Sequence, residues 1–346
     1  MTATWHRYPL HFYQPATTSR NTLRIKESWF IRLSHPHQPD VVGIGECGLL
    51  KTLSYDDRPG YEAKLQEVCL HVDQYLEQLD LLNQWPSIRA GLEMASLDLK
   101  AQGSRELFPS DFTQNEAPIP INGLIWMGDQ AHMRSQIGPK LEAGFHTIKL
   151  KVGAIDFEKE LELIRLIRKD FGPDQITLRL DANGAFSNKD PLEKLKIYSD
   201  FHIHSIEQPI RAGHWEEMAA LCEASPIPIA LDEELIGVVE ADQQKRLLSV
   251  IRPPYIILKP SFLGGFAASQ GWIDLATAQG ADWWATSALE SNIGLNAIAQ
   301  WTYTLNNPLP QGLGTGQLFS NNIPSPLEVR HGKLYYRQDG MWGSLP

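Results

Sequence analysis

Cysteines, long apolar runs and clusters of basic residues are all scarce in this sequence of 346 residues. Its three cysteines are scattered without a Cys-x-x-Cys pair, which fits reduced thiols better than disulfides or a zinc site. No stretch stays apolar for the ~20 residues that a membrane-spanning helix needs. The formal net charge of −10 argues against a nucleic-acid or membrane-surface partner. Because the first residues lack the charged and apolar regions of an export signal, we expect a cytoplasmic protein.

The first third of the chain mixes two kinds of pattern, which indicates an α+β domain over residues 1–115. Apolar and polar residues alternate at 23–33 and 41–46, as they do in half-buried strands. Helical spacing of apolar residues follows at about 61–82 and 87–102.

From residue 116 to residue 320, strands and helices are expected to alternate with a period near thirty residues. Seven helices lie between eight strand candidates, and no Gly-x-Gly-x-x-Gly fingerprint follows the first strand, so the pattern favours a closed parallel barrel over an open sheet. The remaining residues, 321–346, contain a strand-like stretch at 333–337, which we expect to return to the N-terminal domain. The strand candidates are residues 119–126, 147–152, 176–181, 205–208, 227–232, 255–259, 282–286 and about 311–314.

Charged side chains mark the ends of five consecutive strand candidates. The stretch from Ile176 to Ala185 shows this most clearly, because apolar and polar residues alternate up to Asp181 and turn residues follow it. Parallel strands present their carboxyl ends at one rim of a barrel, where such folds keep their chemistry. The charged residues recur every 25 to 30 positions, one strand-helix unit apart, and are Lys151, Asp181, Glu207, Asp232 and Lys259.

Three converging carboxylates without histidine or cysteine are typical of a hard oxygen site, hence of Mg²⁺ or Mn²⁺ and not of zinc. A lysine on each side of such a metal indicates proton abstraction next to a carboxylate, with the metal stabilising the enediolate charge. In so acidic a chain, lysines and metal would also attract a small anionic substrate. Lys149 precedes Lys151 on the same strand face, beside the expected base. One such residue alone is typical of a surface charge or a buried ion pair, but five in this order favour an active site.

The motifs around these five residues resemble those of the enolase superfamily, and in particular its muconate-lactonizing branch, which has a lysine on each side of the metal. The resemblance implies a modified (β/α)₇β barrel, a TIM-like α/β fold that lacks the eighth helix. It also implies an α+β capping domain built from the N-terminal region and the C-terminal tail. The motifs are Lys149-Leu150-Lys151, Asp181-Ala182-Asn183, Glu207-Gln208-Pro209, Asp232-Glu233 and Lys259-Pro260.

Within this branch the chain most resembles the o-succinylbenzoate synthase family. That resemblance implies a metal-dependent lyase of menaquinone biosynthesis, with Mg²⁺ as its cofactor and Mn²⁺ as an alternative. The reaction would dehydrate 2-succinyl-6-hydroxy-2,4-cyclohexadiene-1-carboxylate, here called the dienecarboxylate, to o-succinylbenzoate. The stretches that carry the resemblance are residues 18–20, 26–30, 43–47, 120–128, 287–294, 312–316 and 321–327.

The same resemblance implies roles for individual residues. Asp181, Glu207 and Asp232 would bind Mg²⁺. Lys151 would remove the proton next to the ring carboxylate and deliver it to the departing hydroxyl. Lys259 would stabilise the anionic ring from the opposite face, because an ammonium above a π system is attractive. Residues expected to orient these groups or to contact the substrate are Lys149, Arg179, Asn183, Glu233, Ser19, Arg20, Ser287 and Glu290.

Two other functions stay open on the sequence. An N-acylamino acid racemase or dipeptide epimerase of the same superfamily would use the same pair of lysines on opposite faces. An Asp-x-Asp motif after the seventh strand would suit the ammonium group of a dipeptide, but the chain has Ser287-Ala288-Leu289-Glu290 there. A more remote alternative is a non-catalytic barrel that binds an anionic metabolite through the metal. The oligomeric state is left open.

Overall fold

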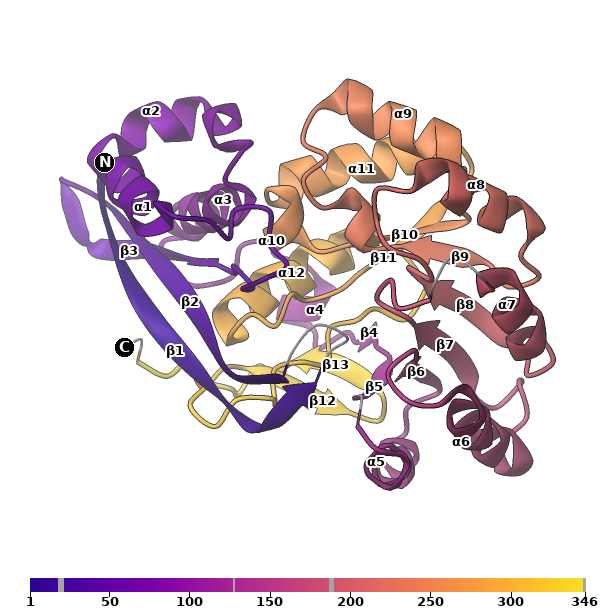
Figure 1. Cartoon of the computed structure of the whole chain (residues 1–346). Helices are drawn as coiled ribbons and strands as arrows, with labels where there is room; N and C mark the ends of the chain where they lie inside the picture. The colour runs from indigo at the N-terminus through magenta and orange to yellow at the C-terminus, as the bar shows by residue number, and fades with distance from the viewer. Residues whose placement is uncertain (18–21, 127, 187–189, 345–346) are drawn as a thin grey trace.

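An antiparallel sheet with helices on one side forms the N-terminal part of the computed structural model (Figure 1). The structure describes residues 1–17, 22–126, 128–186 and 190–344. The sheet has the order β1-β2-β3, and its strands are β1 (Thr2–Thr17), β2 (Thr22–His35) and β3 (Gln38–Cys47). The helical segments are α1 (Tyr61–Leu70), α2 (Val72–Glu77), η1 (Leu79–Leu82) and α3 (Pro86–Lys100).

This capping domain buries a core of its own between the sheet and the helices. Trp29, Ile31 and Leu33 of β2 point toward Leu65 of α1 and Leu92 of α3. These three residues alternate along β2, as expected of a strand, but the opposite face is also buried, because Phe30 packs in the core of the barrel. The long strand β1 had not been predicted, because it carries prolines and many polar residues, which only an edge strand tolerates.

Gly45 allows β3 to lie directly on α3. A Cβ atom at this position would come within 1.9 Å of the carbonyl oxygen of Gly91, which is helix backbone and cannot swing away. We expect Gly45→Ala to lower the free energy of unfolding by about 1–3 kcal/mol, as overpacked cores do. Urea unfolding of Gly138→Ala, a site with no atom within 4 Å of the new Cβ, provides the matched control. Equal unfolding midpoints in the two variants would contradict this packing.

Asp56 holds the beginning of α3 from the loop that follows β3. Its Oδ2 accepts hydrogen bonds from the backbone N–H and the hydroxyl of Ser87, at 2.9 and 2.6 Å. Burial raises the pKa of Asp56 to about 6, although the Ser87 bonds lower it.

The raised pKa of Asp56 predicts a pH dependence of stability. The folded protein binds this proton more tightly than the unfolded chain, so the free energy of unfolding should fall as pH rises from about 4 through 6, by up to about 3 kcal/mol. Asp56→Asn should lack that part of the slope in urea unfolding at fixed Mg²⁺. Asp40→Asn, at an exposed carboxylate, should keep it. An unchanged slope in Asp56→Asn would contradict the assignment.

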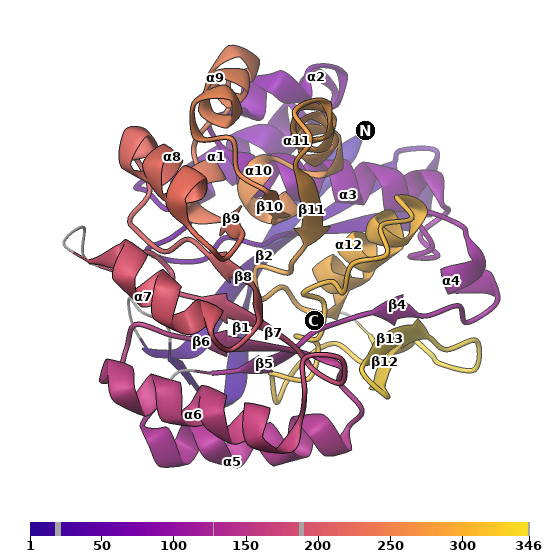
Figure 2. The same ribbon diagram turned by 90° about the vertical axis from the view of Figure 1, so that its right-hand side faces the viewer.

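A curled parallel sheet ringed by helices forms the second part of the molecule (Figures 1 and 2). Its seven strands follow one another in space in the order of the chain. They are β5 (Gly123–Ile125), β6 (Thr147–Lys151), β7 (Thr177–Asp181), β8 (Ile203–Glu207), β9 (Ile229–Leu231), β10 (Tyr255–Leu258) and β11 (Asp282–Ala285). The helices are α5 (Gln130–Glu142), α6 (Phe157–Asp170), α7 (Pro191–Ser199), α8 (Trp215–Ala224), α9 (Ala241–Ile251), α10 (Pro260–Leu263), α11 (Phe266–Ala278) and α12 (Asn292–Thr304), with the short η2 (Glu233–Leu235).

The eighth strand position is filled by two residues. Gln311 forms a parallel bridge to Ile121, and Gly312 forms one to Thr286, so this segment closes the gap between β11 and β5. In the described residues, no helix lies between this segment and β12. The predicted modified barrel with a capping domain is therefore confirmed. No helix of the described chain has the length and apolar character needed to cross a membrane.

The C-terminal tail forms a hairpin of β12 (Leu327–Arg330) and β13 (Lys333–Tyr336). The strand at 333–336 was predicted, but its partner is β4 (Ile119–Pro120) at the entrance of the barrel and not the β1-β2-β3 sheet. Contact with the capping sheet comes from the segment before the hairpin, where Asn321 accepts from the backbone N–H of His11 at 2.8 Å. A short helix, α4 (Asp111–Gln114), precedes β4.

Candidate active site

Five charged side chains lie at, or directly after, the ends of adjacent strands at one rim of the barrel. In the parallel register Lys151 lies opposite Asp181, and Asp181 lies opposite Glu207. Asp232 follows the end of β9, and Lys259 follows the end of β10. All five residues predicted from the strand-end spacing are therefore brought to the same rim, as the geometry of parallel strands requires.

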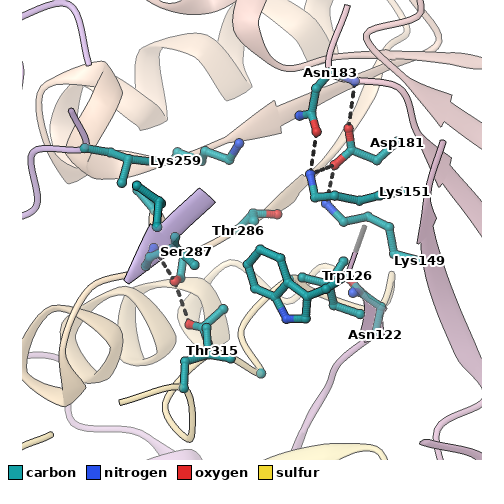
Figure 3. Close-up of a pocket in the computed structure, with 18 of the residues that line it drawn as sticks. Asn122, Trp126, Lys149, Lys151, Asp181, Asn183, Lys259, Thr286, Ser287 and Thr315 are labelled. Atoms are coloured by element: carbon teal, nitrogen blue, oxygen red, sulfur yellow. Dashed lines mark hydrogen bonds and ion pairs between the residues drawn. The ribbon is translucent and has the colours of Figure 1, made fainter. Parts of the chain in front are cut away.

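A cavity of about 520 Å³ opens above this rim. The capping domain contributes part of its wall through residues 50–53, and the barrel contributes the rest. Figure 3 shows Lys151 and Asp181 on one side of the cavity and Lys259 on the other, with Ser287 and Thr315 at a third wall. The charged and amide residues at its floor are Lys149, Lys151, Asp181, Asn183, Glu233 and Lys259.

The lysines and the carboxylates of the rim pair with one another. The Nζ atom of Lys149 lies 2.8 Å from Oε2 of Glu207 and 3.2 Å from Oδ2 of Asp181. The Nζ atom of Lys151 lies 2.8 Å from the same Asp181 oxygen, and Lys259 lies 2.5 Å from Oδ2 of Asp232. With the ammonium groups in these positions, no three acidic, histidine or cysteine side chains of the described residues are arranged to hold a metal ion.

Two buried carboxylates of this cluster, Glu207 and Glu233, have raised pKa values and an oxygen without a hydrogen-bond partner. Burial raises the pKa of Glu207 to about 8, and the neighbouring Asp181 and Asp232 act in the same direction although Lys149 opposes them. Burial, followed by the charge of Asp232, raises the pKa of Glu233 to about 7. The Oε1 atom of Glu207 and the Oε2 atom of Glu233 are buried without a hydrogen-bond partner. A cation among these carboxylates would satisfy such oxygens.

Asp181 and Lys149 shift in the opposite sense. Burial would raise the pKa of Asp181, but the charges of Lys151 and Lys149 outweigh it and hold that pKa far below its usual range. Burial would lower the pKa of Lys149, but the charges of Glu207 and Asp181 hold it above its ordinary value. Asp181 is therefore ionised and Lys149 protonated at neutral pH.

Asn183 connects Lys151 to Glu233. Its Oδ1 accepts from the Nζ of Lys151 at 2.5 Å, and its Nδ2 donates to Oε1 of Glu233 at 3.0 Å. The residue has a φ of 45°, a left-handed conformation that asparagine tolerates better than most residues. The turn after β7 thus aims the Asn183 amide at the lysine.

Arg179 lies deeper in the barrel than the other predicted residues. Its guanidinium stacks 4.0 Å from the ring centroid of Trp284 and donates to the carbonyl of Pro310 at 2.8 Å. Burial lowers its pKa to about 10. It precedes Asp181 by two residues on the same face of β7, so it occupies the layer of barrel interior below the rim.

The remaining predicted residues have separate locations. Ser287 lines the cavity, and its hydroxyl lies 2.6 Å from that of Thr315. Glu290 is fully buried behind that wall and bonds to Ser261 and to the backbone N–H of Ala288. Ser19 and Arg20 lie outside the described residues.

One wall of the cavity had not been predicted. Helix α5 contributes His132, Ser135, Gln136 and Pro139, and Gln136 bonds to both backbone groups of Trp126. Their spacing of three and four residues places them on one helix face, which could have indicated a common surface. Nothing in the sequence says that this surface faces the cavity.

Comparisons with known proteins agree with this architecture. The family model described as Enolase C-terminal domain-like matches residues 132–340. The o-succinylbenzoate synthase of Desulfotalea psychrophila is 47% identical over 96% of this chain and 98% of that protein. The crystal structure of MenC from the same organism has a TM-score of 0.85 at 44% identity and covers 97% of this chain and 99% of that one.

A relative with another activity is also similar. The D-Ala-D/L-Ala epimerase of Cytophaga hutchinsonii is 32% identical over 75% of this chain and 72% of that protein. The full-length match to the synthase and the family match over the barrel confirm the resemblance stated from the motifs. The chain therefore belongs to the Enolase C-terminal domain-like family, and so to the enolase superfamily.

Proposed function

We propose that the chain is a metal-dependent lyase that dehydrates the dienecarboxylate to o-succinylbenzoate, a step of menaquinone biosynthesis. The observation that carries this proposal is the 47% identity to an o-succinylbenzoate synthase over 96% of the chain. The two lysines that face each other across the cavity give the proposal a mechanism. The substrate is a small anion, and a cytoplasmic location stays a prediction.

Asp181, Glu207 and Asp232 would hold Mg²⁺, or Mn²⁺ in its place. Carboxylate oxygens are the ligands that these ions prefer, and members of the enolase superfamily use a divalent metal. The unpartnered, buried Oε1 of Glu207 fits this assignment. When bound, the ion supplies positive charge that neutralises the substrate carboxylate as the neighbouring proton leaves.

Lys151 would act as the general base. Its side chain is 9% exposed, and Asp181 and Asn183 fix its Nζ at the cavity floor. The Nζ atom takes the proton next to the ring carboxylate and then donates it to the hydroxyl on the same face, which leaves as water. One C–H and one C–O bond break and the ring becomes aromatic, so the atoms balance without a further reactant.

Lys259 would stay protonated on the opposite face of the ring. Burial lowers its pKa, but the charges of Asp232 and Glu233 outweigh burial and hold the pKa above the ordinary value. An ammonium in that position stabilises the negative charge that the ring acquires. It needs to transfer no proton in the dehydration, whereas an epimerase needs both lysines to do so.

The succinyl tail would lie along the wall formed by Ser287, Thr315 and Asn122, which supply hydroxyl and amide groups. Leu50 of the capping domain and Phe262 of the barrel pack together beside this wall and exclude water. A dipeptide would instead need a carboxylate there for its ammonium. This difference favours the synthase over the epimerase, whose 32% identity otherwise makes it the second candidate.

Product analysis with three substrates tests the proposal. Purified protein with Mg²⁺ is incubated with the dienecarboxylate, with an N-succinyl amino acid in D₂O, and with L-Ala-L-Glu in D₂O, and products are identified by mass spectrometry. We expect loss of water from the dienecarboxylate. Deuterium uptake by the other two substrates should be absent or far slower than this dehydration. Deuterium exchange without dehydration would overturn the proposed function and assign the epimerase or racemase activity.

A further inference from the structure

Glu46 joins the capping domain to the barrel through a buried carboxylate. It lies near the end of β3 and is fully buried. Its Oε1 accepts from the hydroxyl of Ser28 at 2.6 Å and from the backbone N–H of Ser291 at 2.9 Å. Its Oε2 accepts from the hydroxyl of Ser291 at 2.5 Å and from the N–H of Gly294 at 3.0 Å. Three bonds of this carboxylate thus reach the N-cap and the first turn of α12, which packs against β3.

The charge of Glu46 is compensated from both sides of the interface. Lys26 of β2 lies 3.7 Å away and is itself buried, at 2% exposure. The N-terminus of a helix of 13 residues also favours a negative charge. Removing a partner from a buried charge pair leaves the other charge unpaired, so such contacts resist separation.

The segment that Glu46 holds continues directly into the cavity wall. Ser287, Ala288 and Leu289 line the cavity, and Leu289 has a φ of 64°, which a leucine adopts only when its neighbours enforce it. Glu290 binds the N–H of Ala288 at 2.6 Å from behind and thereby fixes this turn. The next residue, Ser291, is the one that Glu46 binds.

The close packing of this interface leaves no room for adjustment. A Cβ atom at Gly294 would come within 2.7 Å of the Cβ of Glu290 and 2.9 Å of the Oε2 of Glu46. Leu10 and Leu50 of the capping domain pack on Ala288 and Leu289 in the same apolar cluster. The position of the cavity wall is therefore determined jointly by the capping sheet and the barrel.

We propose that Glu46 is a positioning residue for the reaction: its buried carboxylate locks the capping domain to the start of α12 and so holds the wall at residues 287–289 where the substrate tail binds. This inference rests on the proposed function for the identity of the substrate. The positioning itself is a property of the fold and can be measured without substrate. Glu46 touches neither the substrate nor the rim of charged residues, so its loss should affect binding more than chemistry.

Two variants perturb this contact from opposite sides. Glu46→Gln removes the charge from the capping side, and Gly294→Ala inserts a methyl group from the barrel side. Asp40→Asn, on the same strand but exposed, controls for the loss of charge. Gly271→Ala in α11, with no atom within 4 Å of the new Cβ, controls for the substitution in a helix. All four proteins are studied as the full chain with Mg²⁺.

Hydrogen exchange followed by mass spectrometry and steady-state kinetics give the two readouts. In both test variants we expect faster amide exchange over residues 286–291, and a KM for the dienecarboxylate raised about tenfold with kcat within about threefold of wild type. Both controls should match wild type. Unchanged exchange in both test variants, or a lower kcat with an unchanged KM, would overturn the proposal. If the wild-type protein does not turn over this substrate, faster exchange still supports the positioning role while the proposed function fails.

Discussion

Lys151→Ala is expected to lower kcat for dehydration of the dienecarboxylate by at least about 10³-fold, because no other base then reaches the proton on that face. Lys149 and Lys259 do not replace it. The former is held by Glu207 and Asp181, and the latter lies across the cavity beside Asp232. The loss should appear in kcat with little change in KM, since the alanine leaves the proposed tail-binding wall intact.

Ultraviolet absorbance of the aromatic product provides the measurement. Lys169→Ala, at an exposed position of α6, serves as the control for purification and folding. Both variants should have the circular dichroism of the wild-type protein. More than a tenth of wild-type kcat in Lys151→Ala would contradict its role as the base.

Loss of the metal is expected to have an effect of similar size. Chelation with EDTA should abolish turnover, and excess Mg²⁺ should restore it, because three clustered carboxylates cannot stabilise a substrate carboxylate without a cation between them. Glu207→Gln should lower activity by at least about 100-fold at saturating Mg²⁺, since it removes a ligand that the substrate cannot replace. The buried, unpartnered Oε1 of Glu207 is the structural ground for choosing this ligand.

Thermal unfolding separates metal binding from activity. Mg²⁺ at about 100 times its Kd should stabilise the wild-type protein by about 2.7 kcal/mol, and it should stabilise Glu207→Gln far less. Glu193→Gln, at an exposed glutamate of α7, should respond to Mg²⁺ as the wild type does. Full activity in EDTA, or an unchanged Mg²⁺ response in Glu207→Gln, would contradict the metal site.

The barrel could be predicted well because its strand-helix period is a local signal. Strands β6 and β7 differ from the predicted ranges by one residue at one end. The partner of β13 could not be predicted, because its antiparallel pairing joins residues 333–334 to residues 119–120. The whole barrel sequence lies between these two segments, and no local pattern encodes such a contact. The edge strand β1 was missed because its prolines obscure the alternation.

The charged rim of the site was also predictable from the strand-helix period, because the strand ends of a parallel barrel lie side by side. Period-two alternation also correctly placed Arg179 on the face of Asp181. It does not tell how deep a residue lies along the strand, and Arg179 proved to be one layer lower, on Trp284. The contact between Glu46 and Ser291 joins residues 245 apart in the sequence and could be found only in the folded structure.

The most direct test of the proposed function is a time course of o-succinylbenzoate formation by the purified wild-type protein with Mg²⁺, followed by addition of EDTA and then of excess Mg²⁺. We expect product to accumulate, to stop on chelation and to resume on addition of the metal. Absence of product in the first phase, from folded protein with intact substrate, would contradict the assignment of dehydratase activity to this site.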